Sequence, residues 1–382
     1  MKITAVKPII VYAGNGNWVF VEIQTDAGIK GLGEGTLLGH ARTIAAGIED
    51  AARYILGRNP LNPDRIWQQI YESDRYRGGP ILMSVMSAID IACWDILAKH
   101  SGLPVWQLLG GACRDKVRLY GRLCRWGTPQ ENFAAHVALV KERGYTAIKF
   151  GFEVPAEGIV DEPALIEACV DQVRSLRDAV GPKVDLCLDT HSILSLPSLA
   201  TLMRALEPFR LFFVEEPVPP EDLSGLRYLR NSTSTPLASG ERLLTKYDFR
   251  PLIYDGLVDY VQPDVCHCGG ITELRKIAAL AESSHTALAP HNPPSHSELA
   301  TMATLHVDAS CPTFAMQEHP ADVPDWRYEL FNERIAIENG YALLPDRPGL
   351  GMTLRPAIAA AHPYQPYTRV SYFHEDGSPA AS

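Results

Sequence analysis

Three acidic residues stand at equal intervals in the middle of the chain. Asp189, Glu215 and Glu241 each lie at the end of a short apolar run, and both intervals are twenty-six residues. If these runs are consecutive parallel strands, the three carboxylates meet at one end of the sheet. Like charges a few ångströms apart repel strongly in a partly dry site, so a hard divalent cation has to compensate them. Oxygen ligands with room for water predict a Mg²⁺ site.

A single carboxylate at a strand end is more often a cap or the partner of an arginine. Three equally spaced carboxylates on consecutive strands favour a shared metal site instead. Glu216 is ambiguous because it follows Glu215 directly, and adjacent strand residues face opposite ways. The regular spacing selects Glu215.

Two histidines belong to the same pattern. His191 follows Asp189 by two residues, so alternation along a strand places both on one face. Asp264 ends the sixth apolar run and His291 the seventh. A carboxylate on one strand can hydrogen-bond an imidazole on the next, fix its tautomer and raise its basicity. His291 is therefore a candidate general base, although a histidine that merely caps a strand would look the same.

The elements that must position these residues alternate regularly from about residue 117. Short apolar runs, separated by longer helical patterns, cover 117–122, 147–152, 185–191, 211–217, 236–242, 259–265, 287–293 and 314–320. Strands buried on both faces and separated by helices are typical of parallel strands with right-handed crossovers. Eight such units favour closure into a (β/α) barrel, with a doubly wound open sheet as the alternative. Lys149 lies on the second strand, and Glu318 ends the eighth and faces the barrel mouth.

The flanking segments differ from this alternation. Two strands around a turn at 26–28, followed by helical patterns, predict an N-terminal α+β domain over 1–115. The barrel then covers 116–328. The segment 329–382 has a Pro/Gly-rich turn and short strands, and we expect it to return to the first domain.

Bulk composition narrows the class of protein. The 382 residues suit one barrel-sized domain with a smaller partner, and the net charge of −10 without a basic tract argues against nucleic-acid binding. No apolar run approaches the ~20 residues of a membrane span, so we expect no membrane association. Cys266 and Cys268 in DVCHCGG resemble half of a zinc motif, but a second cysteine pair is missing. We expect a cytoplasmic protein with reduced thiols.

The motifs together resemble the enolase superfamily, in its mandelate-racemase-like subgroup. LDTH, VEEP, SGER, QPD and APHNP stand at the ends of strands three to seven in the order that this family uses. Within the subgroup, YRGGPILMS, PVWQLLGG, CGGITE, QEH, PGLG and HED look like the D-galactonate dehydratases. The resemblance implies a modified TIM barrel, (β/α)7β, with an N-terminal α+β capping domain completed by the C-terminal segment.

The resemblance also implies a reaction. A Mg²⁺-dependent hydro-lyase would convert D-galactonate to 2-dehydro-3-deoxy-D-galactonate and water through an enediolate. His291, oriented by Asp264, would remove the C2 proton, and His191 would protonate the leaving C3 hydroxyl. Glu318 would hydrogen-bond the developing enediolate.

Other contacts and the assembly follow from the same resemblance. Lys149 and, in the cap segments over the barrel mouth, Trp18 and Arg77 are expected to contact the sugar, although Trp18 could equally be a core residue and Arg77 a surface charge. The partner is a small acid sugar, and relatives are commonly symmetric homo-oligomers, often octamers.

Some positions depart from the family pattern. Racemase relatives carry Lys-x-Lys on the second strand, whereas here Gly151 replaces the second lysine, which argues for dehydration over racemisation. Gly151 and His319 also differ from the galactonate group. A different acid sugar, such as gluconate or an aldarate, a cycloisomerase or epimerase reaction, and a catalytically silent relative therefore stay open.

Overall fold

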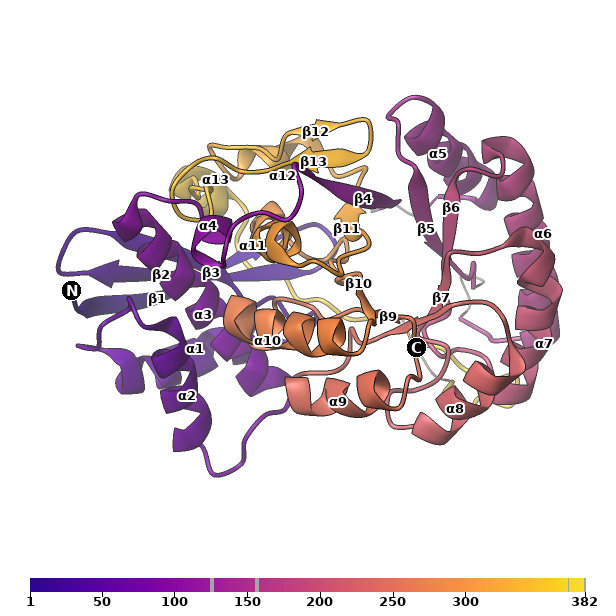
Figure 1. Ribbon diagram of the computed structural model, residues 1–382, viewed down its shortest axis with the longest axis horizontal. Coiled ribbons are helices and arrows are strands. Elements are labelled where there is room, and N and C mark those ends of the chain that lie inside the picture. Colours follow the sequence, from indigo (N-terminus) through magenta and orange to yellow (C-terminus); the bar gives the residue numbers. More distant parts are fainter. Residues whose placement is uncertain (124–126, 155–157, 370, 381–382) are drawn as a thin grey trace.

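The computed structural model describes residues 1–382 except 124–126, 155–157, 370 and 381–382. The chain forms an α+β cap beside a larger barrel, and Figure 1 shows the cap around the N-terminus and the barrel helices on the far side. The cap contains β1 (Ile3–Tyr12), β2 (Asn17–Thr25), β3 (Lys30–Glu34), α1 (Ala41–Ile55), α2 (Pro63–Ser73), α3 (Pro80–Ser101) and α4 (Val105–Leu108).

The cap sheet is antiparallel, in the order β1-β2-β3, and its last strand packs directly on α3. Glycines at alternate positions make this close approach possible. A Cβ added at Gly33 would lie 2.0 Å from the carbonyl oxygen of Ala88, and one at Gly31 would lie 2.2 Å from that of Ala92. Strand and helix therefore meet backbone to backbone along this stripe.

We expect Gly33→Ala to lower the free energy of unfolding by about 1–3 kcal/mol, the usual cost of overpacking a tight core. The added methyl has backbone on its far side, which cannot move as a flexible side chain would. Urea denaturation measures the change. Gly28→Asn is the control, because its site is open and asparagine tolerates the φ of +76° there. An unchanged urea midpoint for Gly33→Ala would contradict this packing.

Helix α3 differs from the expectation that no apolar stretch approaches the length of a membrane span. It spans 22 residues and is long and apolar enough, by length and composition, to cross a membrane. However, 83% of its most apolar stretch is buried between the cap sheet, α1 and α10. Its apolar surface is therefore the centre of the junction between cap and barrel, as in the core helix of a soluble protein.

The barrel alternates strands and helices. Its strands are β4 (Lys116–Arg122), β5 (Ala147–Gly151), β6 (Asp185–Asp189), β7 (Phe213–Glu215), β8 (Leu237–Ser239), β9 (Tyr260–Val261), β10 (Ala287–Leu288) and β11 (Gln317–Pro320). The helices between them are α5 (Pro129–Lys141), α6 (Glu162–Val180), α7 (Leu196–Leu206) with the 3₁₀ turn η1 (Glu207–Phe209), α8 (Leu223–Ser232), α9 (Lys246–Tyr254), α10 (Gly270–Ser283) and α11 (Glu298–Ser310).

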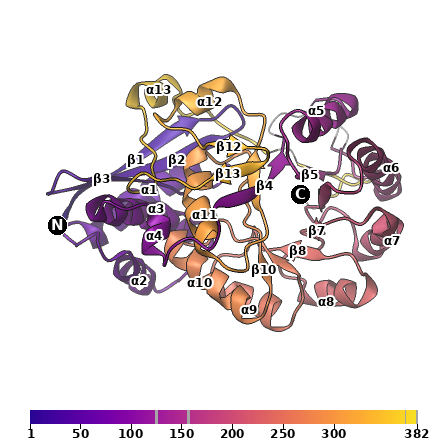
Figure 2. The ribbon, with the colours of Figure 1, turned by 45° about the horizontal axis from the view of Figure 1, so that its top comes forward.

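The strand pairing closes the barrel. Strands β4 to β10 pair in sequence order, all parallel, and β11 pairs with β4. Between β10 and the approach to β11, the backbone N–H of Ala315 donates to the carbonyl of Leu288 at 2.8 Å. Figure 2 shows the ring of strands with helices outside it. The predicted (β/α)7β barrel with a cap is confirmed, and the open-sheet alternative is excluded.

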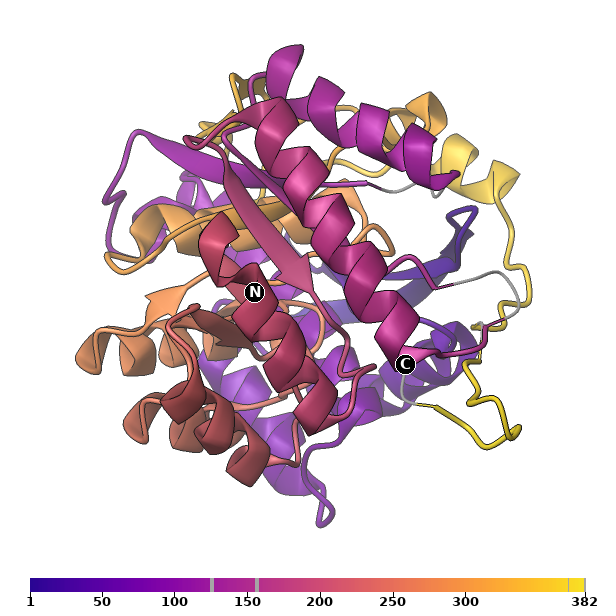
Figure 3. The ribbon, with the colours of Figure 1, turned by 90° about the vertical axis from the view of Figure 1, so that its right-hand side faces the viewer.

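The C-terminal segment contacts both parts of the molecule. It contains α12 (Asp325–Glu329), β12 (Ile337–Glu338), β13 (Tyr341–Leu343) and α13 (Pro356–Ala361). Strand β13 pairs antiparallel with β4, which extends the barrel sheet. Farther along, the carbonyl of His362 accepts a hydrogen bond from Tyr12 of β1 at 2.8 Å, and the segment then runs along one side of the molecule (Figure 3). The division into 1–115, 116–328 and 329–382 stays a prediction.

Candidate active site

The site residues follow from alternation along the barrel strands. The interior of the barrel is packed with one buried side chain from most strands: Tyr120, Ala147, Cys187, Phe213, Ala238, Ala289 and Met316. Side chains two residues apart share a face of a strand. The next inward-facing layer therefore contains Arg122, Lys149, Asp189, Glu215, His291 and Glu318. This layer lies at the C-terminal ends of the strands, where barrel active sites are found.

The structure brings the three predicted metal ligands together. One carboxylate oxygen from each of Asp189, Glu215 and Glu241 lies within 4.8 Å of the other two. Oε2 of Glu215 is buried and has no hydrogen-bond partner among the described residues. Burial raises the pKa of Glu215 to about 8, and the neighbouring carboxylates add to this effect against the opposing pull of Lys149. Three converging oxygens, one of them unpartnered, fit a hard divalent cation such as Mg²⁺.

Glu216 turns away from this cluster, as alternation requires. Its Oε1 accepts hydrogen bonds from the hydroxyl of Ser239 at 2.7 Å and the backbone N–H of Gly240 at 3.0 Å, and its Oε2 pairs with Arg242. These contacts occupy both oxygens of Glu216, which therefore links the ends of β7 and β8, and Glu215 is the residue that converges with Asp189 and Glu241.

Lys149 lies at the centre of the carboxylates. Its Nζ is 2.6 Å from Glu215, 2.9 Å from Glu318 and 3.4 Å from Asp189, and its side chain is buried. Oε2 of Glu318 accepts a hydrogen bond from the backbone of Asn292 at 3.0 Å. Burial raises the pKa of Glu318, but Lys149 and His291 outweigh this effect and the pKa lies below its usual value. Lysine and glutamate thus fix each other at the barrel mouth.

Asp264 and His291 form the predicted dyad. Nδ1 of His291 lies 2.7 Å from Oδ2 of Asp264, and its Nε2 lies 3.1 Å from Glu241. Burial opposes the charged imidazolium, but Glu241 and Asp264 outweigh it and raise the pKa of His291 to about 10. Since a base must be neutral to accept a proton, a cation on Glu241 would weaken this pull and favour the basic form.

His191 lies in a turn beyond the end of β6 at Asp189, so it is not placed by alternation along the strand, as the sequence pattern predicted, although it lies close to Asp189. Its backbone has a φ of +46°, which is unusual for a non-glycine residue at a strand end. The imidazole Nδ1 lies 3.3 Å from Oδ1 of Asp189, and 31% of its side chain is exposed. The turn thus places a partly exposed imidazole beside Asp189 of the carboxylate cluster.

A cavity of about 470 Å³ joins the two histidines. It is lined by His191, His291 and Glu241, together with Leu37, Leu38, Pro80, Arg242, Leu244, His267, Pro293, Ser295, His296 and Arg369. The cap contributes Leu37, Leu38 and Pro80, and the C-terminal segment contributes Arg369. The candidate acid and base therefore face one space large enough for a small sugar.

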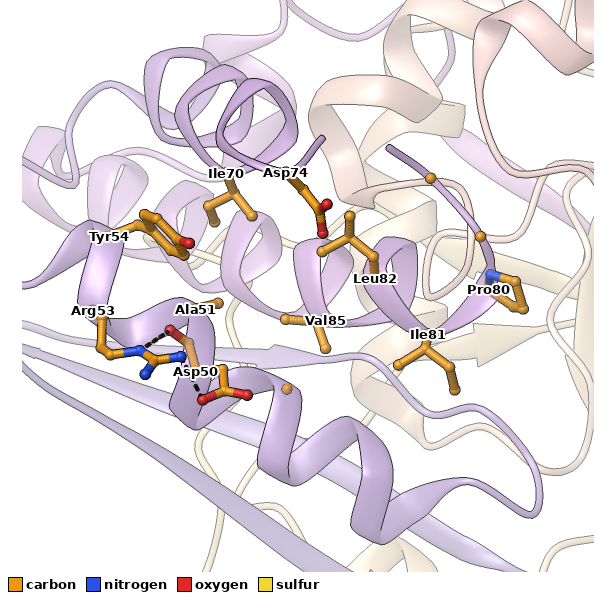
Figure 4. Close-up of a pocket in the computed structure, with 13 residues that line it drawn as sticks. Asp50, Ala51, Arg53, Tyr54, Ile70, Asp74, Pro80, Ile81, Leu82 and Val85 are labelled. Atoms are coloured by element: carbon orange, nitrogen blue, oxygen red, sulfur yellow. Dashed lines mark hydrogen bonds and ion pairs between the residues drawn. The ribbon is translucent and has the colours of Figure 1, made fainter. Parts of the chain in front are cut away.

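The structure does not bring the two predicted cap contacts to this cavity. Trp18 is 1% exposed and packs against Trp326 and Arg327. Arg77 pairs on the surface with Glu72. Another cavity, of about 480 Å³, lies between α1, α2 and the start of α3 (Figure 4) and has none of the predicted site residues in its wall.

Arg122 was not among the predicted site residues, and Gly151 and His319 are the positions where the sequence departs from the family pattern. Arg122 is buried in the same inward layer, two residues after Tyr120, and this spacing could have identified it from the sequence. A Cβ added at Gly151 would lie 3.9 Å from the Arg122 guanidinium, so that group stands beside the space left by the glycine. His319 faces outward, where its Nδ1 contacts the Tyr145 hydroxyl at 2.8 Å, away from the cavity.

Comparisons with known proteins agree with this fold and site. Residues 6–110 match the mandelate racemase / muconate lactonizing enzyme N-terminal domain, and residues 132–358 match the enolase C-terminal domain-like family. The chain therefore belongs to the mandelate racemase / muconate lactonizing enzyme family of the enolase superfamily. This confirms the resemblance stated from the motifs.

Individual relatives indicate which members of the family this chain is most usefully compared with. The chain is 37% identical to a D-galactonate dehydratase of Ralstonia pickettii, with all of both chains covered. It is 38% identical to the D-galactonate dehydratase of Pectobacterium atrosepticum, covering 93% of this chain and 92% of that one. An enolase from Pantoea ananatis with bound D-gluconate and magnesium superimposes over the full length of both chains with a TM-score of 0.91 and 31% identity.

Proposed function

We propose that this chain is a Mg²⁺-dependent acid-sugar dehydratase that converts D-galactonate to 2-dehydro-3-deoxy-D-galactonate and water. The observation that carries the proposal is the cavity that His191, His291 and Glu241 line together. A dehydratase needs a base for the C2 proton and an acid for the C3 hydroxyl, and here two separate imidazoles face one space. Full-length likeness to D-galactonate dehydratases supports the choice of substrate.

In this proposal Asp189, Glu215 and Glu241 hold Mg²⁺. The cation, when bound, stabilises the negative charge that develops on the substrate carboxylate as the C2 proton leaves. A neighbour with bound magnesium supports this cofactor. The carboxylate cluster described above has the oxygen-only ligands that Mg²⁺ prefers.

The protein residues have distinct roles. His291, held by Asp264 through Nδ1, accepts the C2 proton at Nε2. His191 donates a proton to the departing C3 hydroxyl, so that water leaves rather than hydroxide. Glu318, fixed by Lys149, hydrogen-bonds the developing enediolate. Lys149 also adds a buried positive charge next to the site of the substrate carboxylate, and the enol product tautomerises to the 2-keto acid.

A panel of acid sugars tests the substrate. We expect turnover with D-galactonate, measured as the semicarbazone of the 2-keto-3-deoxy product. D-Gluconate is the second candidate, because the Pantoea ananatis neighbour holds it. The panel also includes aldarates, and product analysis by NMR separates dehydration from epimerisation or cycloisomerisation. Absence of turnover with every acid sugar, in protein that binds Mg²⁺, would contradict an enzymatic role.

We expect His191→Asn to block dehydration by about 10²–10⁴-fold, the usual contribution of a general acid, while leaving C2 proton exchange. The reason is that His191 and His291 are separate groups on one cavity. Incorporation of solvent deuterium at C2 of recovered substrate, followed by NMR, measures exchange. His40→Asn, an exposed histidine at the start of α1, is the control. Loss of exchange in His191→Asn with Mg²⁺ binding intact would show that the roles of acid and base are assigned wrongly.

We also propose a cytoplasmic location and a symmetric homo-oligomer, with an octamer as the candidate assembly, and no nucleic-acid or membrane partner. The net charge of −10 and the burial of α3 support a soluble protein. Size-exclusion chromatography with light scattering measures the assembly.

A further inference from the structure

The loop between α2 and α3 presents an exposed aromatic side chain. Tyr76 is 87% exposed, more than any other large hydrophobic side chain among the described residues. Its backbone N–H donates to Oδ1 of Asp74 at 2.8 Å, and this hydrogen bond fixes the turn that carries it. Arg75 and Arg77 flank it in the sequence, and Arg77 pairs with Glu72. Tyrosine and arginine are among the side chains that most often contribute binding energy at protein interfaces.

The cavity of Figure 4, which we call the cap cavity, lies directly beside this loop. It has a volume of about 480 Å³, and Asp74 and Gly79 of the loop form part of its wall. Ile70, Leu82 and Val85 give the wall an apolar part. Exposed residues of α1 edge the cap cavity, so it opens at the surface. It therefore has room for a tyrosine ring that enters from outside, whereas Tyr76 of the same chain stays in solvent.

The charges around the cap cavity complement those of the loop. Asp50 and Asp74 lie on its wall, and Figure 4 shows their carboxylates on opposite sides of Val85. Asp50 pairs with Arg53. Neither Asp74 nor Arg75 forms an ion pair within the part of the chain that the structure describes. Two adjacent, unpaired charges of opposite sign suit a partner that carries the same two charges.

A contact around a two-fold axis requires this arrangement. Each copy presents the same surface, so a protruding group and the hollow that accepts it must lie side by side on one chain. We propose that a second copy of this chain binds here, with Tyr76 of each copy in the cap cavity of the other. Arg75 then lies beside the carboxylates of Asp50 and Asp74 of the other copy. The contact is part of the symmetric homo-oligomer, so this inference rests on the proposed function.

The same contact reaches the wall of the substrate cavity. Pro80 lines both the cap cavity and the cavity that His191 and His291 face. Gly78 and Gly79 precede it with φ of +81° and +79°, and a Cβ added at either glycine would have no atom within 4 Å. The chain before Pro80 therefore has little support on these sides within one copy. A second copy in the cap cavity supports it, and so holds one wall of the substrate cavity in place.

Size-exclusion chromatography with light scattering tests the contact on the full-length protein. We expect an even number of copies in the wild type, because each two-fold contact joins two. Tyr76→Ser should lower the mass at least twofold, since serine leaves the cap cavity of the other copy unfilled. Tyr228→Ser is the matched control, because Tyr228 is also exposed, at 53%, but lies on α8. Circular dichroism checks that each variant is folded.

Reversed charges provide a second test that leaves Tyr76 in place. Arg75→Glu gives the loop the sign of the cap cavity, and Asp50→Lys gives the edge of the cap cavity the sign of the loop. Each variant alone should associate at least tenfold more weakly, because like charges then meet. In an equimolar mixture both contacts of a mixed pair again have opposite charges, so the wild-type mass should return. A mixture of the two folded variants that fails to associate would overturn the two-fold arrangement.

Activity separates this inference from the proposed function. With D-galactonate turnover established, Tyr76→Ser should raise KM at least threefold, because the wall at Pro80 loses its support. An unchanged KM in the dissociated variant would overturn the coupling between the two cavities. A monomeric wild type, or a wild-type mass in Tyr76→Ser, would overturn the interface itself. A protein that turns over no acid sugar, but whose mass still depends on Tyr76, would contradict the proposed function and leave the interface supported.

Discussion

Substitution of His291 by asparagine is expected to reduce turnover by about 10²–10⁴-fold, the range that a general base contributes. Asparagine can still donate a hydrogen bond to Asp264 but has no basic nitrogen at the position of Nε2. Exchange of the C2 proton with solvent deuterium should disappear with turnover, which distinguishes this variant from His191→Asn. Steady-state rates and NMR of recovered substrate provide the two measurements.

His285→Asn is the matched control for His291→Asn. His285 is exposed and has a φ of +55°, which asparagine accommodates, so this variant should retain full activity. Exchange that continues in His291→Asn would mean that another group removes the C2 proton. Lys149 would then be the next residue to test, because it lies in the same inward-facing layer as His291 and contacts Glu318.

Removal of the metal ion is expected to cause the second large loss of turnover. We expect a chelator to abolish turnover and added Mg²⁺ to restore it, and Glu241→Gln to weaken Mg²⁺ binding at least tenfold. A glutamine keeps the shape of Glu241 but removes one of three charges that converge within 4.8 Å. Isothermal titration with Mg²⁺ measures the affinity. Glu221→Gln, an exposed carboxylate after β7, serves as the control. Full activity of Glu241→Gln in metal-free buffer would remove the metal from the mechanism.

The barrel, Asp189 and Glu215 were predictable from the period of two along strands, whereas Glu241 follows the end of β8 and was found only through the interval of twenty-six residues. Strands with period two place Asp189 two residues after Cys187, and Glu215 two residues after Phe213, on the inner face. The same rule applied to the first strand identifies Arg122. The sequence pattern therefore predicts which residues on the barrel strands face inward.

The cap contacts were not predictable, because no repeat governs them. Trp18 packs against Trp326, and more than 300 residues of sequence separate the two. Arg77 lies near the cavity-lining Pro80 in sequence, yet its guanidinium pairs with Glu72 on the surface. Arg369 reaches the cavity from an irregular segment that has no periodic signal. Only the packing of cap, barrel and C-terminal segment decides which of these side chains meets substrate.

The return of the C-terminal segment sets an order of events during synthesis. The side-chain amide of Asn17, at the start of β2, donates to the carbonyl of Gln365 at 2.7 Å, across a separation of 348 residues. At about 5–20 residues per second, a ribosome needs roughly 17–70 s to cover that interval. Until then, the edge of the cap near Tyr12 and Asn17 lacks the backbone partners that it has in the folded protein. The domain that is translated first is thus completed last, after the barrel that it covers.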